Sequence, residues 1–176
     1  MAATETIPKA EFAYTQLSAG GWHILLTKMH SLFSHNDAWS GGYFELAIEL
    51  GARSDDRLRS AMCKVWEHPT LSGCYRQHDL EPELQVRIDP GSLDLDETAY
   101  GVAKIPGIGT TCCLTTTFRE EDKSDWLMLG VPMGSLSLVA NVGAYPFEDS
   151  TDLSWRLLMQ AWLRQVAESI FESVPF

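Results

Sequence analysis

The chain has 176 residues, of which 45% are hydrophobic and 21% charged, a composition that suits one globular domain with a sizeable core. Its 24 acidic and 13 basic residues give a formal net charge of −11, so we expect no nucleic acid and no anionic membrane surface among its partners. The N-terminus lacks a signal-peptide pattern, no apolar stretch approaches roughly 18 residues, and the four cysteines form no C-x-x-C pair. These features predict a cytoplasmic protein.

Composition along the chain predicts a flexible arm at residues 1–10 and a single domain over residues 11–176. Apolar residues between positions 11 and 33 recur at helical spacing, and the pair Gly20–Gly21 interrupts or begins that helix. The polar, glycine-containing run at 34–42 is typical of a loop.

Residues 43–50 alternate between apolar and other side chains, which predicts a half-buried strand. Ser54 is well placed to cap a following helix, with Asp55 and Asp56 in its first turn. Pro69 ends this helix. Its apolar face is formed by Leu58, Ala61, Met62, Val65 and Trp66.

The second half of the chain predicts further strands and a C-terminal helix. Two short strands are expected at 71–77 and 84–89, followed by an acidic connection at 90–100 and a loop at 104–110. The remaining expected elements are strands at 111–118 and 126–131 around a charged turn, a strand or edge segment at 136–142, and a helix over 152–173 capped by Asp149, Ser150 or Thr151. Together they predict an α+β fold: a two-layer sandwich in which helices cover one face of a mostly antiparallel sheet of about five or six strands.

The order of these elements, with His68-Pro69-Thr70-Leu71 after the first helix, resembles the N-terminal lobe of the chloramphenicol acetyltransferase and peptide-synthetase condensation-domain superfamily. The resemblance covers roughly residues 43–173. It implies that an HHxxxDG motif should follow the apolar strand at 126–131, and that its second histidine would act as a general base. Here Pro132 and Met133 stand at the histidine positions and no Asp-Gly follows. Acyl transfer by the family mechanism is therefore not expected, and a single lobe would be either a degenerate binding module or an independent small protein that reuses the topology.

Candidate catalytic groups are few. His30, His35 and Asp37 could converge as acid–base or metal-binding groups of a small enzyme acting on an apolar or acyl substrate, although His30 and His35 would not share a helix face. The alternative is a capped helix end with surface histidines. His68 is expected to be an imidazolium at a helix C-terminus, and His78 to pair with Asp79 or Glu81. Adjacent Cys112 and Cys113 are expected to be structural and to face opposite sides of a strand.

Three aromatic residues, Trp22, Trp39 and Tyr145, are candidates for lining an apolar ligand pocket, whereas Trp126 is expected in the core. Trp39 and Tyr145 stand in loops with glycine or proline, where a large aromatic residue favours binding. The leading hypothesis is accordingly a non-catalytic domain that binds a small apolar ligand or a protein partner, including a second copy in a homodimer. No cofactor and no metal are expected.

Seven acidic residues cluster at 79–97, countered there by Arg87 alone. The cluster suits either a solvated edge of the domain or a docking face for a basic protein, which the chain would then inhibit.

Overall fold

The computed structural model describes residues 32–119, 124–143 and 152–174. The elements are β1 (Tyr43–Ala52), α2 (Asp55–Glu67), β2 (Leu71–Tyr75), the 3-10 turns η1 (Pro82–Leu84) and η2 (Pro90–Ser92), β3 (Ala99–Ile105), β4 (Gly109–Arg119), β5 (Ser124–Pro132), α3 (Met133–Ser137) and α4 (Ser154–Phe171). Of the helix expected between residues 11 and 33, residues 11–31 lie outside the described residues, as does the flexible arm, and Leu32 and Phe33 lie in a turn. The three candidate capping residues at 149–151 also lie outside, and α4 begins later than expected, with Leu153 at its N-cap.

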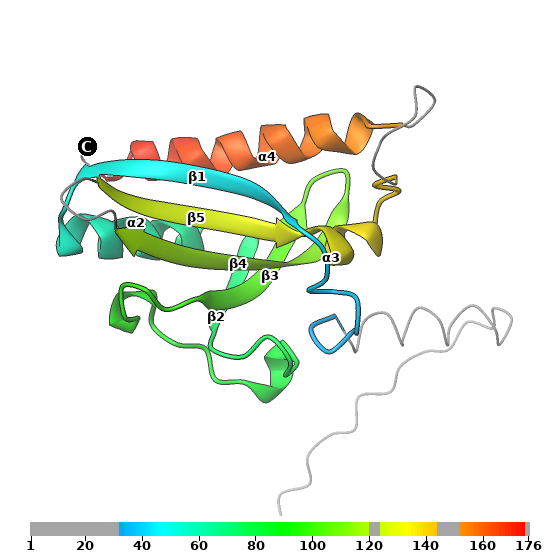
Figure 1. Ribbon diagram of the computed structural model, residues 1–176, viewed down its shortest axis with the longest axis horizontal. Coiled ribbons are helices and arrows are strands. Elements are labelled where there is room, and N and C mark those ends of the chain that lie inside the picture. The colour runs from blue at the N-terminus through cyan, green and yellow to red at the C-terminus, as the bar shows by residue number, and fades with distance from the viewer. Residues whose placement is uncertain (1–31, 120–123, 144–151, 175–176) are drawn as a thin grey trace, which may run out of the picture. The chain divides into compact units, whose positions relative to one another are not determined.

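The five strands form one sheet in the order β1-β5-β4-β3-β2, and every neighbouring pair is antiparallel. Helices α2 and α4 lie together on one side of this sheet (Figure 1). The predicted α+β sandwich, with helices covering one face of an antiparallel sheet, is confirmed. No helix in the described part of the chain is both long and apolar enough to cross a bilayer.

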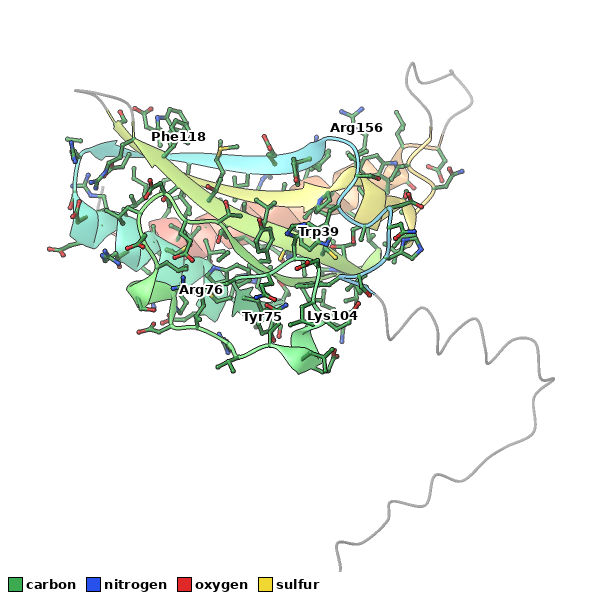
Figure 2. The ribbon with its side chains drawn as sticks, turned by 60° about the horizontal axis from the view of Figure 1, so that its bottom comes forward. Trp39, Tyr75, Arg76, Lys104, Phe118 and Arg156 are labelled. Carbon is green, nitrogen blue, oxygen red and sulfur yellow. The ribbon has the colours of Figure 1, made fainter. Side chains whose placement is uncertain are left out.

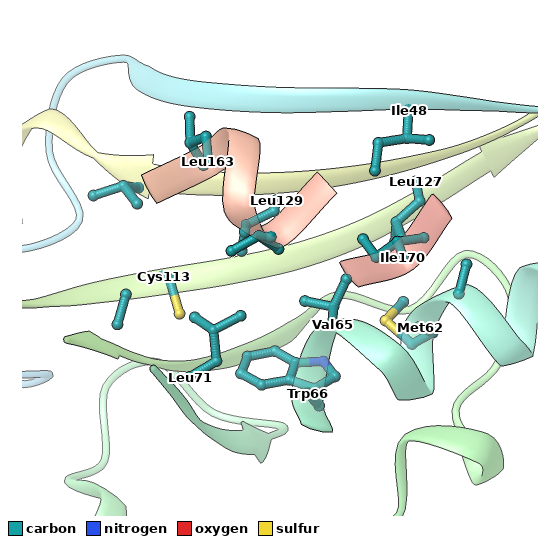
Figure 3. Packing of buried hydrophobic residues seen from close by; sticks show 14 of the residues in the cluster. Ile48, Met62, Val65, Trp66, Leu71, Cys113, Leu127, Leu129, Leu163 and Ile170 are labelled. Carbon is teal, nitrogen blue, oxygen red and sulfur yellow. The ribbon is translucent and has the colours of Figure 1, made fainter. Parts of the chain in front are cut away.

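The core fills the space between the sheet and the two helices (Figure 3). The predicted apolar face of α2 is buried as expected, and Trp66, 1% exposed, lies over Gly101 of β3. The indole Nε1 of Trp66 donates a 3.0 Å hydrogen bond to Thr115 Oγ1 of β4, which satisfies its polar atom inside the core. A glycine is needed at position 101 because a side chain there would occupy the volume of the Trp66 ring.

The start of α2 is tied to the β4–β5 hairpin by a buried carboxylate. Ser54 caps the helix as predicted, and its own N–H donates to Asp125, which is 1% exposed. Arg119 donates to Asp125 at 2.7 Å and also pairs with Asp55. Desolvation alone would raise the pKa of Asp125, but the bonds from Arg119 and Ser54 outweigh it and hold that pKa below its usual value.

Three predictions about secondary structure are wrong. Residues 84–89 form no strand, since Val86 is 86% exposed and pairs with nothing in the sheet. Strand β3 is missing from the prediction, because three of its four core-facing residues, Ala99, Gly101 and Ala103, are small. Residues 136–142 begin inside α3 rather than in a strand, because the chain turns after Pro132 and its backbone bonds become local, as in Ala140 N–H to Leu136 O.

Candidate functional site

The sheet face opposite the helices is the candidate site. Neither α2 nor α4 covers this face, which we call the open face. Figure 2 looks toward it, with Trp39 and Phe118 labelled. Alternate residues of four adjacent strands point to this face, and the strand register aligns them in rows. One row is Glu45, Gly130, Leu114 and Tyr100; the next along the strands are Ala47, Met128 and Thr116, then Glu49, Trp126 and Phe118.

The loop before β1 covers one end of this face. Phe33 and Ala38 are buried there against Cys112, which faces away from the main core. Trp39 Nε1 donates a 2.9 Å hydrogen bond to Phe33 O, so the loop is closed on itself. Adjacent Cys112 and Cys113 thus face opposite sides of β4, as predicted.

Two further contacts attach this loop to the domain. The Glu81 carboxylate accepts hydrogen bonds from the N–H groups of Phe33 and Ser34, at 3.2 and 2.8 Å, and from the Ser34 hydroxyl. At the other end, Gly134 N–H donates to Ser40 O, and a Cβ at position 134 would lie 1.8 Å from Asp37 O. The loop that carries Trp39 is therefore anchored at both ends.

Trp39 contacts several aromatic rings, and those of Tyr100 and His78 border the sheet face beside it. Its ring centroid lies 5.3 Å from that of Tyr100 and 5.6 Å from that of His78, both in edge-to-face geometry. The rings of His78 and Tyr100 are 5.2 Å apart. Such contacts fix the ring orientations and build one wall of the site from three distant parts of the chain.

Between this wall and β1 lies a hollow of about 380 Å³. Its residues are Trp39, Tyr43, Glu45, His78, Thr98, Tyr100, Leu114, Thr116, Met128 and Gly130. Gly130 keeps the floor low, because a Cβ there would lie 3.3 Å from the Tyr43 ring and 3.6 Å from Leu114. Burial, and after it the electrostatic effect of Tyr43, raises the pKa of Tyr100, so the phenol of Tyr100 stays neutral.

Of the three predicted ligand-binding residues, Trp39 lines this hollow, whereas Trp22 and Tyr145 lie outside the described residues. Sequence reasoning missed Tyr43, Tyr100, His78 and Met128, which the strand register brings beside Trp39. It also placed Trp126 wrongly, since that residue is half-buried on the open face and stacks on Phe118 with centroids 5.8 Å apart.

The histidine candidates have other surroundings. His35 Nδ1 accepts a 3.2 Å hydrogen bond from Asp37 N–H, the Asp37 side chain is exposed, and His30 lies outside the described residues. Within the described ranges, no group of three His, Cys, Asp or Glu side chains is arranged to hold a metal ion. The pairing expected for His78 is wrong, because its ring lies against Trp39 and Tyr100 while Glu81 binds the loop.

The surroundings of His68 oppose the imidazolium that its place at the end of α2 favours. Burial lowers its pKa, because desolvation disfavours the charged ring. Its Nδ1 lies 2.8 Å from the Thr70 hydroxyl, which accepts a 2.8 Å hydrogen bond from Trp162 Nε1. The Thr70 hydroxyl can then donate to a neutral His68, so this motif links α2, β2 and α4 structurally.

Burial also disfavours the thiolates. It raises the pKa of Cys74 and of Cys112 to about 12, and that of Cys113 well above its usual value. Cys63 is half-buried, and its pKa is raised by desolvation and then by Asp89. These four cysteines do not have the lowered pKa that a nucleophile needs.

Part of the acidic segment at 79–97 stabilises the fold. Besides Glu81, Glu97 pairs with Arg76 at 2.7 Å, and Asp89 accepts a hydrogen bond from Gly91 N–H. Within the described part of the chain, the side chains of Asp79, Glu83, Asp94 and Asp96 are exposed and have no polar partner.

Comparisons with protein-family models, with curated proteins and with solved structures each return no match. At the end of β5, Pro132 is buried and Met133 begins α3. The resemblance to an acyltransferase lobe stays a prediction.

Proposed function

We propose that this protein is a non-catalytic ligand-binding domain and that the hollow on the open sheet face is its binding site. The observation that carries the proposal is the hollow itself, with three contacting aromatic rings as one wall and Leu114, Met128 and Gly130 as its floor. Its volume of about 380 Å³ lies in the range of small-molecule sites, which are concave and mostly apolar with a few polar groups.

The surroundings of the hollow support a preformed site. Trp39 is held by its bond to Phe33 O, and Glu81 fixes the loop that carries it. The loop is therefore already ordered before a ligand binds, so that binding loses less conformational entropy and the affinity is higher. No acyl-transfer step belongs to the proposal, because Pro132 and Met133 cannot accept a proton.

The test is a screen of small aromatic and apolar fragments by ligand-observed NMR against the full-length protein and two variants. Trp39→Leu removes a wall of the hollow. Trp126→Leu removes a half-buried tryptophan from the same sheet face, outside the hollow, and is the matched control. We expect fragments to bind the wild type and Trp126→Leu but to lose at least about tenfold in affinity for Trp39→Leu. Equal binding to all three folded proteins would refute the assignment.

A further inference from the structure

The charges around the hollow narrow the class of its ligand. Glu45 is the carboxylate among the lining residues, and its side chain is exposed on β1. None of the described residues that line the hollow is a lysine or an arginine. The chain as a whole carries a formal charge of −11, so its long-range field also attracts cations and repels anions.

The aromatic residues add a second attraction for the same kind of ligand. The electron-rich faces of tryptophan and tyrosine attract a cation placed within about 6 Å of the ring centroid. Tyr43 and Tyr100 stand on strands at opposite sides of the hollow, and Trp39 contacts Tyr100. A site with these rings and one carboxylate recognises an organic ammonium better than a carboxylate or a phosphate.

The register gives the scale of the site. Glu45 and Tyr100 occupy the same row with β5 and β4 between them, so their backbones are three strand spacings, about 14 Å, apart. Side chains from both ends occupy part of that width. Gly130, in the same row, has no side chain, so that the Tyr43 ring and Leu114 can lie close to the floor beside Glu45.

We infer that the ligand of this hollow is a small organic cation whose ammonium group binds between the Glu45 carboxylate and the rings of Trp39, Tyr43 and Tyr100. The inference rests on the proposed function, since it names the ligand class of the same hollow. A small molecule is favoured over a basic protein because the hollow is local, and Ala47 and Glu49 farther along β1 do not line it.

The experiment compares choline with 3,3-dimethyl-1-butanol, which has the same shape but a neutral carbon in place of the nitrogen. Both are titrated at low salt and pH 8, following the indole N–H signals by ¹⁵N NMR. Two variants are included: Glu45→Gln, which removes the carboxylate of the hollow, and Glu49→Gln, which removes a matched exposed carboxylate on the same strand.

We expect choline to bind the wild type and Glu49→Gln about tenfold more tightly than the neutral alcohol, and this preference to disappear in Glu45→Gln. Equal affinity of the wild type for both probes would overturn the cation inference while leaving the proposed binding site intact. A preference that persists in Glu45→Gln would overturn the role of that carboxylate. Binding of neither probe would overturn the cation inference, while the proposed function would still be decided by the fragment screen with Trp39→Leu.

Discussion

Replacing Gly101 with alanine tests how the sheet packs against α2. A Cβ at this position would lie 2.3 Å from Trp66 Cζ3, 2.6 Å from Trp66 Cη2 and 2.7 Å from Ser72 O. Carbon atoms normally approach to about 3.5 Å, so the overlap with the ring is roughly 1 Å. The ring cannot move away freely, because Trp66 is fully buried and donates to Thr115.

The magnitude follows from these contacts. Overpacking a rigid core costs about 1–3 kcal/mol. Displacing the indole also weakens its hydrogen bond to Thr115, which costs about 1 kcal/mol. The lower entropy cost of ordering alanine rather than glycine returns about 0.5–1 kcal/mol. We therefore expect Gly101→Ala to lower the free energy of unfolding by about 2–3 kcal/mol, which corresponds to a Tm decrease of about 8 °C in a domain of this size.

Urea denaturation followed by tryptophan fluorescence measures this loss. Gly42→Ala is the control, because a Cβ at position 42 has no neighbour within 4 Å, and it should change stability by less than about 0.5 kcal/mol. The penalty of Gly101→Ala should also shrink in a Trp66→Leu background, where the ring is absent. If Gly101→Ala were as stable as Gly42→Ala, the described packing of Trp66 over β3 would be wrong.

Three further predictions concern the buried carboxylate, the thiols and the floor of the hollow. Asp125→Asn should lower the free energy of unfolding by about 2 kcal/mol at pH 7, because Arg119 and Ser54 N–H lose the charged carboxylate between them, although Arg119 keeps Asp55. The pKa of Asp125 is lowered, so its contribution is present above pH 3.8 and is lost as the pH falls below that value. Acid titrations of the two proteins should therefore converge, and a constant gap would contradict the sign. In the native protein, Ellman's reagent should react slowly with one thiol, and Cys63→Ser should remove that reaction. Rapid reaction of two or more thiols would contradict the burial of Cys74, Cys112 and Cys113. Gly130→Val should abolish fragment binding, because the valine side chain would fill the floor of the hollow. Its Tm should change by no more than a few degrees, since valine favours strands. Undiminished binding to this variant would show that the ligand binds elsewhere.

Periodicity predicted the elements whose buried side chains are large. The alternation in β1 and the spacing of the α2 face were sufficient, because those residues pack against the opposite layer. It failed for β3, because Ala99, Gly101 and Ala103 on its core side are small, with Gly101 making room for Trp66, and Ile105 is the one large residue there. In the segment at 84–89, apolar and polar residues alternate as in a strand, but the segment does not join the sheet and its Val86 is exposed.

The candidate site was only partly predictable for a related reason. Trp39 could be singled out, because a large aromatic residue in a glycine-containing loop is unusual. The contribution of Tyr43, His78 and Tyr100 depends on the strand order and on the position of the loop after β2, which no local pattern encodes. The need for a glycine at position 130 likewise depends on Tyr43, which the register places on the neighbouring strand.

The most direct test of the binding site uses the methionine methyl groups as reporters. Met128 lies on the floor of the hollow, whereas Met62 and Met159 lie on the buried faces of α2 and α4, on the opposite side of the sheet. In ¹H–¹³C NMR spectra of protein labelled at the methionine methyl groups, a bound fragment should shift the Met128 signal in a saturable manner and leave those of Met62 and Met159 unchanged. Saturable binding that shifts Met62 or Met159 but leaves Met128 in place would contradict the assignment of the open sheet face as the binding site.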